Sequence, residues 1–151
     1  MEVREYRPSD SEGVKNLILS ILEKEYPFDR SAYRDTDISD ISGTYSGKGS
    51  AFYVAEADNE IMGTVGVKRD AKESALLRRL FVEEKHRKKG LGTMLIDKAI
   101  EFCRQESYGE IIFRATDRMS AAMKLCKKKG FKEKDDLEVS GFHIHQFTLK
   151  L

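Results

Sequence analysis

The sequence lacks an excess of charge of either sign. Its 151 residues carry 27 basic and 26 acidic side chains, which leaves a formal charge of +1. A dedicated nucleic-acid-binding domain normally shows a marked basic excess. The balance therefore argues against nucleic acid as a partner, although Arg87–Lys89 and Lys127–Lys129 form two short basic runs.

Cysteine is scarce as well. Cys103 and Cys126 lie far apart, and neither has a second cysteine or a histidine at metal-ligand spacing. This scarcity excludes a disulfide framework and a cysteine-based zinc motif. We therefore expect a reduced, intracellular chain with no bound metal.

Long hydrophobic runs are also missing. The most apolar early stretch, Leu17–Leu22, is far too short to span a bilayer. The opening residues MEVREYRPSD are polar and charged, unlike a secretory signal. We expect a cytoplasmic protein that does not enter a membrane. Without a repeat or a linker, the length predicts a single domain over residues 1–151.

Two nucleotide-binding signatures are incomplete in this sequence. A dinucleotide fingerprint G-x-G-x-x-G starting at Gly90 needs glycine where the chain has Leu95. A P-loop around Gly47-Lys48 needs Ser or Thr where Gly49 stands. The P-loop pattern also lacks the glycine that should stand five residues before Gly47. Neither signature is present.

Short apolar strands and amphipathic helices are what the sequence does contain. Their order predicts one α/β domain with a mixed sheet. In the connection after the first helix, a turn or short helix is expected near residues 37–41. Asp117 is placed to cap the third helix. The strands are expected at 3–7, 52–56, 61–68, 76–82, 111–115, 132–139 and 143–149, and the helices at 11–25, 90–107 and 118–129.

The stretch HRKKGLG, residues 86–92, joins a predicted strand to a predicted helix. Unpaired N–H groups in the first turn of a helix, together with the helix dipole, make an anion site that suits phosphate. Gly90 and Gly92 carry no side chain to keep a pyrophosphate from the backbone. A plain solvated basic face before a helix remains the alternative.

Three segments together resemble one known superfamily. Leu77–Val82 followed by Arg87-Lys88-Lys89-Gly90-Leu91-Gly92 is similar to the GNAT N-acetyltransferase pattern of a strand and then [R/Q]-x-x-G-x-[G/A]. The segment from Ala122 to Phe131 resembles the family's A-x-x-L-Y-x-x-x-G-F, and the hairpin from Tyr53 to Gly66 resembles its V-A-E … I-V-G.

The resemblance implies a GNAT fold and acetyl-CoA as the cosubstrate. The fold is a single mixed, mostly antiparallel sheet with a splayed parallel pair at the cofactor cleft and helices on both faces. Leu80, Phe81 and Val82 would lie along the pantetheine arm, and one main-chain N–H there would stabilise the oxyanion. Backbone N–H groups of Arg87, Lys88, Lys89, Gly90, Leu91, Gly92 and Thr93 would hold the pyrophosphate. Acetyl would then pass directly to an acceptor amine.

The catalytic acid and base are the weakest part of this resemblance. Cys126 stands where many members carry the tyrosine that protonates the CoA thiolate; a buried packing role is the alternative. The family's glutamate position holds Leu76, so Glu73 and Glu56 are the nearest candidate bases. His143 and His145 are further proton-relay candidates, with a structural role as the commoner outcome.

The acceptor amine is not fixed by the sequence. Asp29, Asp35, Asp37 and Asp40 could attract a cationic amine, or could simply cap helices and keep the chain soluble. An N-acetyltransferase acting on a small molecule, amino acid or peptide is the leading hypothesis. A non-catalytic acyl-CoA-binding or regulatory module is the alternative. A homodimer is a candidate assembly, because it is the commonest soluble oligomer.

Overall fold

The computed structural model describes residues 2–27 and 36–151. A single sheet runs through the molecule in the order β1-β2-β3-β4-β5-β8-β6, with β7 paired to β8. Only β4 and β5 pair in parallel; the other described pairs are antiparallel. The strands are β1 (Glu2–Glu5), β2 (Ala51–Ala57), β3 (Glu60–Ala71), β4 (Ser74–Val82), β5 (Glu110–Ala115), β6 (Lys132–Glu133), β7 (Leu137–Val139) and β8 (Phe142–Lys150).

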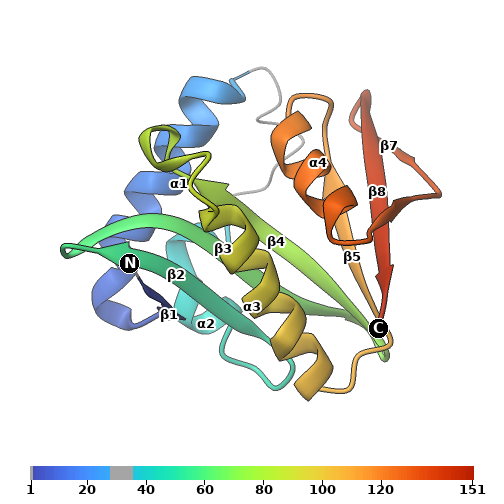
Figure 1. The fold of residues 1–151 in the computed structure, drawn as a ribbon, viewed down its shortest axis with the longest axis horizontal. Helices are drawn as coiled ribbons and strands as arrows, with labels where there is room; N and C mark the ends of the chain where they lie inside the picture. The colour runs from blue at the N-terminus through green and yellow to red at the C-terminus, as the bar shows by residue number, and fades with distance from the viewer. Residues whose placement is uncertain (1, 28–35) are drawn as a thin grey trace.

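Helices cover both faces of the sheet, as Figure 1 shows. One core cluster gathers buried residues of α3 (Leu91–Gln105) and α4 (Ser120–Lys128) against the sheet. The other gathers those of α1 (Ser11–Glu25) and α2 (Ile41–Thr44) on the opposite face. Strand β4 contributes Leu77 and Leu80 to the first cluster and Phe81 to the second. Leu77 and Leu80 share a face although they are three residues apart, because the register of β4 with β3 shifts between them.

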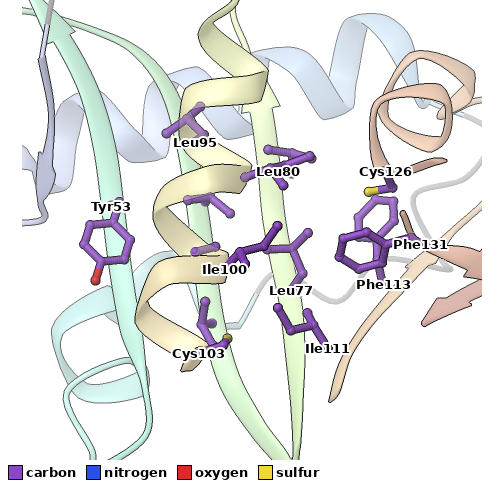
Figure 2. Packing of buried hydrophobic residues seen from close by; sticks show 14 of the residues in the cluster. Tyr53, Leu77, Leu80, Leu95, Ile100, Cys103, Ile111, Phe113, Cys126 and Phe131 are labelled. Carbon is purple, nitrogen blue, oxygen red and sulfur yellow. The ribbon is translucent and has the colours of Figure 1, made fainter. Parts of the chain in front are cut away.

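The first core is a continuous apolar layer beneath α3. Figure 2 shows Leu95 and Ile100 of this helix near Leu80 and Leu77 of β4. The apolar positions of α3 recur at helical spacing, which is why the sequence predicts this helix well. Because it packs rigidly, this layer fixes where α3 begins relative to the end of β4.

Strands β4 and β5 lie together at one end and separate toward the other. Their pairing starts at Ser74 with Glu110 and ends at Leu77 with Phe113. Figure 1 shows the two strands meeting near the C-terminus and diverging toward the ends that lead to α3 and α4. The fold class, the single mixed sheet and the splayed parallel pair are confirmed.

The C-terminal strands differ from the prediction of one strand over 132–139. The chain turns at Asp135, which has a φ of 58°, so the segment forms the two short strands β6 and β7. The Asp136 carboxylate accepts the Gln146 N–H at 3.0 Å in place of a ladder bond. The sequence shows no break, because Lys132 to Asp136 is a uniformly charged run.

The start of α4 is a second difference. The helix begins at Ser120, and its N-cap residue is Met119 rather than Asp117. The Asp117 carboxylate instead contacts Nε2 of His145, at 2.5 Å. A tertiary contact has therefore replaced the local capping bond that the sequence favours.

No helix in residues 2–27 or 36–151 combines the length and the apolar character needed to cross a bilayer.

Candidate active site

Strand β4 bulges at the point where it leaves β5. Arg79 has a left-handed φ of 53°. Across the ladder, Thr64 of β3 opposes Phe81 while Gly66 opposes Arg78, so one β3 residue faces two of β4. A bulge of this kind interrupts the ladder and redirects the strand. It places Leu80 and the following residues at the opening between β4 and β5.

A buried ion pair holds the bulge in place. Arg79 donates to both carboxylate oxygens of Asp37, at 3.0 and 2.6 Å, and each side chain is 5% exposed. The Tyr45 hydroxyl also donates to Asp37, at 2.7 Å. Burial raises the pKa of Asp37, but the Arg79 guanidinium and the Tyr45 hydroxyl outweigh burial and bring it below its usual range. Asp37 is therefore ionised and structural.

The loop after β4 turns twice through left-handed conformations before α3. Lys88 has a φ of 63° and Gly90 a φ of 79°. Gly90 is also the N-cap of α3, and as a glycine it has no side chain to accept a hydrogen bond from the first turn. The N–H groups at the start of this helix, which has 15 residues, are left for an anion.

The two loop glycines are needed for different reasons. A Cβ at Gly90 would meet nothing within 4 Å, so its requirement is the positive φ. A Cβ at Gly92 would lie 2.7 Å from Cδ2 of Leu125 on α4. Gly92 therefore permits close approach of α3 to α4, a reason that differs from the direct clearance of a pyrophosphate expected from the sequence.

A cleft of about 450 Å³ lies between these parts. It brings together all the cofactor residues predicted from the sequence except Lys89. Those that line it are Leu80, Phe81, Val82, Arg87, Lys88, Gly90, Leu91, Gly92 and Thr93. The far wall comes from the start of α4 and the turn before it, including Arg118, Ser120 and Leu125.

The Arg87 side chain is engaged within the protein. Its guanidinium binds both oxygens of Glu25 on α1, at 2.8 and 2.7 Å, and its Nε donates to the Val82 carbonyl at 2.9 Å. The hydrogen bonds with Glu25 raise the pKa of Arg87. Arg87 thus ties the loop to α1 and β4, and the backbone N–H groups remain the anion donors.

Cys126 lies in the core and does not line the cleft. It is fully buried, and Figure 2 shows it beside Phe131 and Phe113. Burial raises the pKa of its thiol to about 12. The side chain therefore occupies the packing position that the sequence left as the alternative to an acid.

Glu56 and Glu73, the two candidate bases, lie outside the cleft at different places. Glu56 pairs with Arg4 at 3.1 Å and borders a separate groove beside α1. Glu73 is exposed in the turn before β4, and its carbonyl accepts the N–H groups of Gly109 and Glu110. The strand then runs seven residues to Leu80, roughly 20 Å at the usual rise. The two glutamates are not brought together.

The two C-terminal histidines also lie outside the cleft lining. His145 sits between Asp117 and Glu133, and its hydrogen bonds to these carboxylates, Asp117 foremost, raise its pKa. His143 lies beside Asp136 at 3.0 Å. Neither ring is placed to relay a proton to the cleft.

The acidic segment does not present a row of free carboxylates. Asp37 is neutralised by Arg79, and the Asp40 carboxylate caps α2 through the Gly43 N–H at 3.0 Å. Asp29 and Asp35 lie outside the described residues. The structure thus assigns capping and buried pairing to the two that it describes.

Two arginines occupy the sheet face opposite α3 and α4, beside the splay. Arg78 and Arg114 directly follow Leu77 and Phe113, the last paired residues of β4 and β5. Because side chains alternate along a strand, both arginines point away from the core that buries Leu77 and Phe113. Arg78 is partly exposed, and its Nη2 lies 3.9 Å from Oδ2 of Asp37. Arg114 is exposed, with its Nε bonded to Gln146 at 2.8 Å. Nothing in the sequence links these two arginines, because only the register of β4 with β5 places both beside the opening.

Tyr26 is a second residue that the sequence analysis missed. It follows α1 directly and lines the cleft with Leu80 and Met119. Among the described residues that form the cleft, it supplies the one phenol. Its position next to Pro27, at a helix end, gave no functional signal.

Known proteins that resemble this chain in sequence or in fold are acetyltransferases. The profile of the acetyltransferase (GNAT) family matches residues 15–131. A probable N-acetyltransferase camello of Xenopus tropicalis is 32% identical over 121 residues, covering 78% of this chain and 55% of that protein. Human N-acetyltransferase 8 is 36% identical over 104 residues, covering 65% and 46%.

The chain thus spans about half the length of these curated relatives, between 46% and 55% of the two named above and of human N-acetyltransferase 8B. Among solved structures, a GNAT acetyltransferase of Staphylococcus aureus superimposes with a TM-score of 0.85 at 25% identity and 99% coverage of both chains. An acetyltransferase of Salmonella typhimurium solved with acetyl-CoA has the same fold, with a TM-score of 0.80 at 16% identity, 99% coverage of this chain and 93% of that one.

The matching profile, the splayed β4–β5 pair and the glycine loop at the start of α3 agree, and the chain belongs to the GNAT acetyltransferase family.

Proposed function

We propose that this chain is an N-acetyltransferase domain that moves acetyl from acetyl-CoA to the primary amine of a small acceptor bearing a carboxylate. One observation carries the proposal. The cleft between the bulged β4 and α4 is lined by the loop and strand residues expected for acetyl-CoA, and it lies at the sheet opening that Arg78 and Arg114 flank on the other face.

The residues present fit acetyl-CoA, which supplies an activated acetyl group when bound. The N–H groups of Leu91, Gly92 and Thr93 would hold the pyrophosphate, with no side chain competing for them. The backbone of Leu80 to Val82, freed from pairing with β5 after Leu77, would hold the pantetheine amides. The binding is therefore mainly a backbone function.

The charges on the sheet face that carries Arg78 and Arg114 favour an acceptor amine that also bears a carboxylate. Asp37 is already neutralised by Arg79, so the described carboxylates of the acidic segment leave no excess of negative charge there. Arg78 and Arg114 can each form charge-assisted hydrogen bonds with a carboxylate, which arginine recognises with two parallel donors. A small acid held there would present its amine at the opening between the strands.

The name of one relative fits this acceptor class. A protein called N-acetylaspartate synthetase, from Xenopus tropicalis, is 34% identical over 99 residues, covering 64% of this chain and 36% of that protein. The product in its name is an acetylated amino acid with an acidic side chain. This supports, for the present chain, an amino acid as the acceptor.

The acceptor proposal is tested by measuring CoA thiol release with a matched set of amines. We expect turnover with aspartate and glutamate to exceed turnover with neutral amino acids, and to exceed turnover with lysine or a polyamine. Arg78→Ala and Arg114→Ala should raise KM for the acidic acceptors, while the exposed Arg104→Ala on α3 should not. A preference for cationic amines would refute the acceptor class.

A non-catalytic acyl-CoA-binding module remains the second candidate, and one observation favours it. Glu25 is the one carboxylate among the described residues of the cleft, and it is paired with Arg87. The described residues of the cleft therefore include no unpaired carboxylate that could act as a general base. Tight acetyl-CoA binding without transfer to any amine would establish the module instead of the enzyme.

A further inference from the structure

A second cluster of titratable side chains lies at the edge of the sheet formed by β6, β7 and β8. The β8 histidine cluster consists of Glu133 at the end of β6, Asp136 before β7, and His143 and His145 on β8. Each side chain offers one ligand atom, and these atoms all lie within 4.8 Å of one another. None of the four lines the acetyl-CoA cleft.

The donor atoms converge at metal-ligand spacing. Nδ1 of His145 lies 2.6 Å from Glu133 Oε2 and 3.8 Å from Asp136 Oδ2. Nε2 of His143 lies 3.0 Å from the same Asp136 oxygen. With bonds of about 2.0–2.1 Å, the donors of a tetrahedral zinc ion lie roughly 3.3 Å apart. The separations in the cluster lie on both sides of that value.

The outer nitrogens of both histidines face other carboxylates. Nε2 of His145 contacts Asp117 at 2.5 Å, and Nδ1 of His143 lies 3.7 Å from Glu138. In metal sites, a ligating histidine almost always gives its other ring N–H to a carboxylate, a carbonyl or water, which fixes the tautomer and the ring orientation. His145 therefore already has the outer hydrogen-bond partner of a metal ligand, and Glu138 lies near the outer nitrogen of His143.

The backbone also places the ligands in advance. His143 and His145 are two residues apart on one strand, so they share a face, and their rings lie 4.6 Å apart. The left-handed turn at Asp135 brings Asp136 back to β8, where the Gln146 N–H holds its other oxygen at 3.0 Å. Little rearrangement is then needed for binding.

We propose that Glu133, Asp136, His143 and His145 form a site for one divalent transition-metal ion, with Zn²⁺ the best match. Two imidazoles with two carboxylates suit zinc, whereas Mg²⁺ and Ca²⁺ prefer oxygen ligands alone. The ion would replace any proton held between the rings and the carboxylates, so binding releases protons to solvent.

The bound ion would have a structural effect close to the cleft. It would fasten the β6–β7 segment to β8 and, through Asp117, hold the turn between β5 and α4. Arg118, the next residue in that turn, lines the cleft. Metal binding should therefore stabilise the wall of the cleft without entering it.

A second group, Glu60, Glu83 and His86, also lies at metal-ligand spacing. Its carboxylates are already compensated by Lys85, whose Nζ lies 3.2 Å from Glu60 and 3.7 Å from Glu83. This group makes a suitable internal control for the test.

The test is titration of tag-free, metal-stripped protein with Zn²⁺ by calorimetry, with Mg²⁺ titrated in parallel and bound zinc counted after dialysis. We expect one Zn²⁺ per chain and no comparable Mg²⁺ binding. His143→Ala and His145→Ala should abolish the stoichiometric site, and Asp117→Asn should weaken it by about 10- to 100-fold. His86→Ala should bind like the wild type.

A folding check and a thermal measurement separate loss of the site from loss of the fold. The variants change half-buried or exposed residues, and their folding is checked by circular dichroism before titration. Zinc should raise the Tm of the wild type and of His86→Ala, but not that of His143→Ala. The proposal is overturned if the wild type binds no zinc, if zinc binding survives in both His143→Ala and His145→Ala, or if His86→Ala removes it. None of these readouts depends on acetyl transfer.

Discussion

Single residues decide how the glycine loop works. The sequence directs attention to its basic side chains, yet Arg87 is held by Glu25 and by the Val82 carbonyl. Gly90 supplies a left-handed turn, and the lack of a side chain at Gly92 leaves room for the Leu125 side chain of α4. We therefore expect backbone N–H groups to bind the anion, and the glycines to give the loop its turn and its close packing.

Gly92→Ala should weaken acetyl-CoA binding by displacing Leu125, which a Cβ would approach to 2.7 Å. We expect about a tenfold rise in Kd, the equivalent of about 1.4 kcal/mol, by calorimetry. In a Leu125→Ala background the same change should cost much less, because the obstructing atom is gone. An equal cost in both backgrounds would show that the alanine acts directly on the ligand.

Proton donation to the departing thiolate is a second question at the scale of the residue. Tyr26 lines the cleft, whereas Cys126 is fully buried with a pKa raised to about 12. We expect Tyr26→Phe to lower kcat by an amount of order 100-fold. Cys126→Ala should leave kcat and its pH profile unchanged while lowering stability. If Cys126→Ala loses the alkaline limb of the pH profile of kcat while Tyr26→Phe keeps the wild-type kcat, Cys126 and not Tyr26 is the proton donor.

At the scale of elements, the shape of β4 depends on a partner distant in the chain. Asp37 and Arg79 are 42 positions apart, and their pair holds the bulge. Asp37→Asn removes the carboxylate charge from a buried ion pair, and breaking such a pair typically costs about 3–5 kcal/mol. Urea unfolding should show this loss, while Lys85→Ala at an exposed ion pair should unfold almost like the wild type. Similar midpoints for the two variants would contradict the role of the pair.

The junction of β1 with α1 should give the protein an acid-sensitive anchor. Arg4 binds both oxygens of Asp10 at 2.8 Å, and these hydrogen bonds lower the pKa of Asp10 despite its burial. A carboxyl whose pKa is lower when folded contributes stability above its unfolded pKa, near 3.9, and loses it as the pH falls through the folded value.

Stability measured against pH should therefore fall more steeply below pH of about 4 in the wild type than in Asp10→Asn. Asp10→Asn should also be less stable than the wild type at neutral pH, where the ion pair is intact. If the free energy of unfolding falls equally steeply below pH of about 4 in both proteins, the Arg4–Asp10 ion pair does not cause the acid sensitivity.

The elements also show where sequence reasoning succeeds. The helices α1 and α3 follow from periodic apolar positions and β5 from a short continuous apolar run, which are local signals. The bulge at Arg79, the break between β6 and β7 and the late start of α4 do not. Each depends on a bond between distant residues, such as Asp117 with His145, 28 positions apart. Local propensity favoured a cap at Asp117, and the tertiary contact replaced it.

At the scale of the whole molecule, the sequence predicted the part of the site whose residues are contiguous in the chain. It did not predict the part whose residues lie on different strands and depend on strand register. Leu80 to Val82 and the glycine loop are sequence-local, and they line one cleft as expected. Arg78 and Arg114 flank the same opening because β4 and β5 pair in parallel up to Leu77 and Phe113 and then separate. The homodimer and the cytoplasmic location stay predictions.

The two faces of the sheet have separate proposed roles. We propose that acetyl-CoA binds on the α3–α4 side through backbone groups, and that an amine bearing a carboxylate reaches it from the side of Arg78 and Arg114. The most direct measurement is steady-state acetylation of aspartate, with the product identified by mass spectrometry, in the wild type and in Arg78→Ala/Arg114→Ala. We predict that the variant keeps the wild-type Kd for acetyl-CoA and loses aspartate turnover mainly through KM. Unchanged KM for aspartate, or acetylation of cationic amines alone, would contradict it.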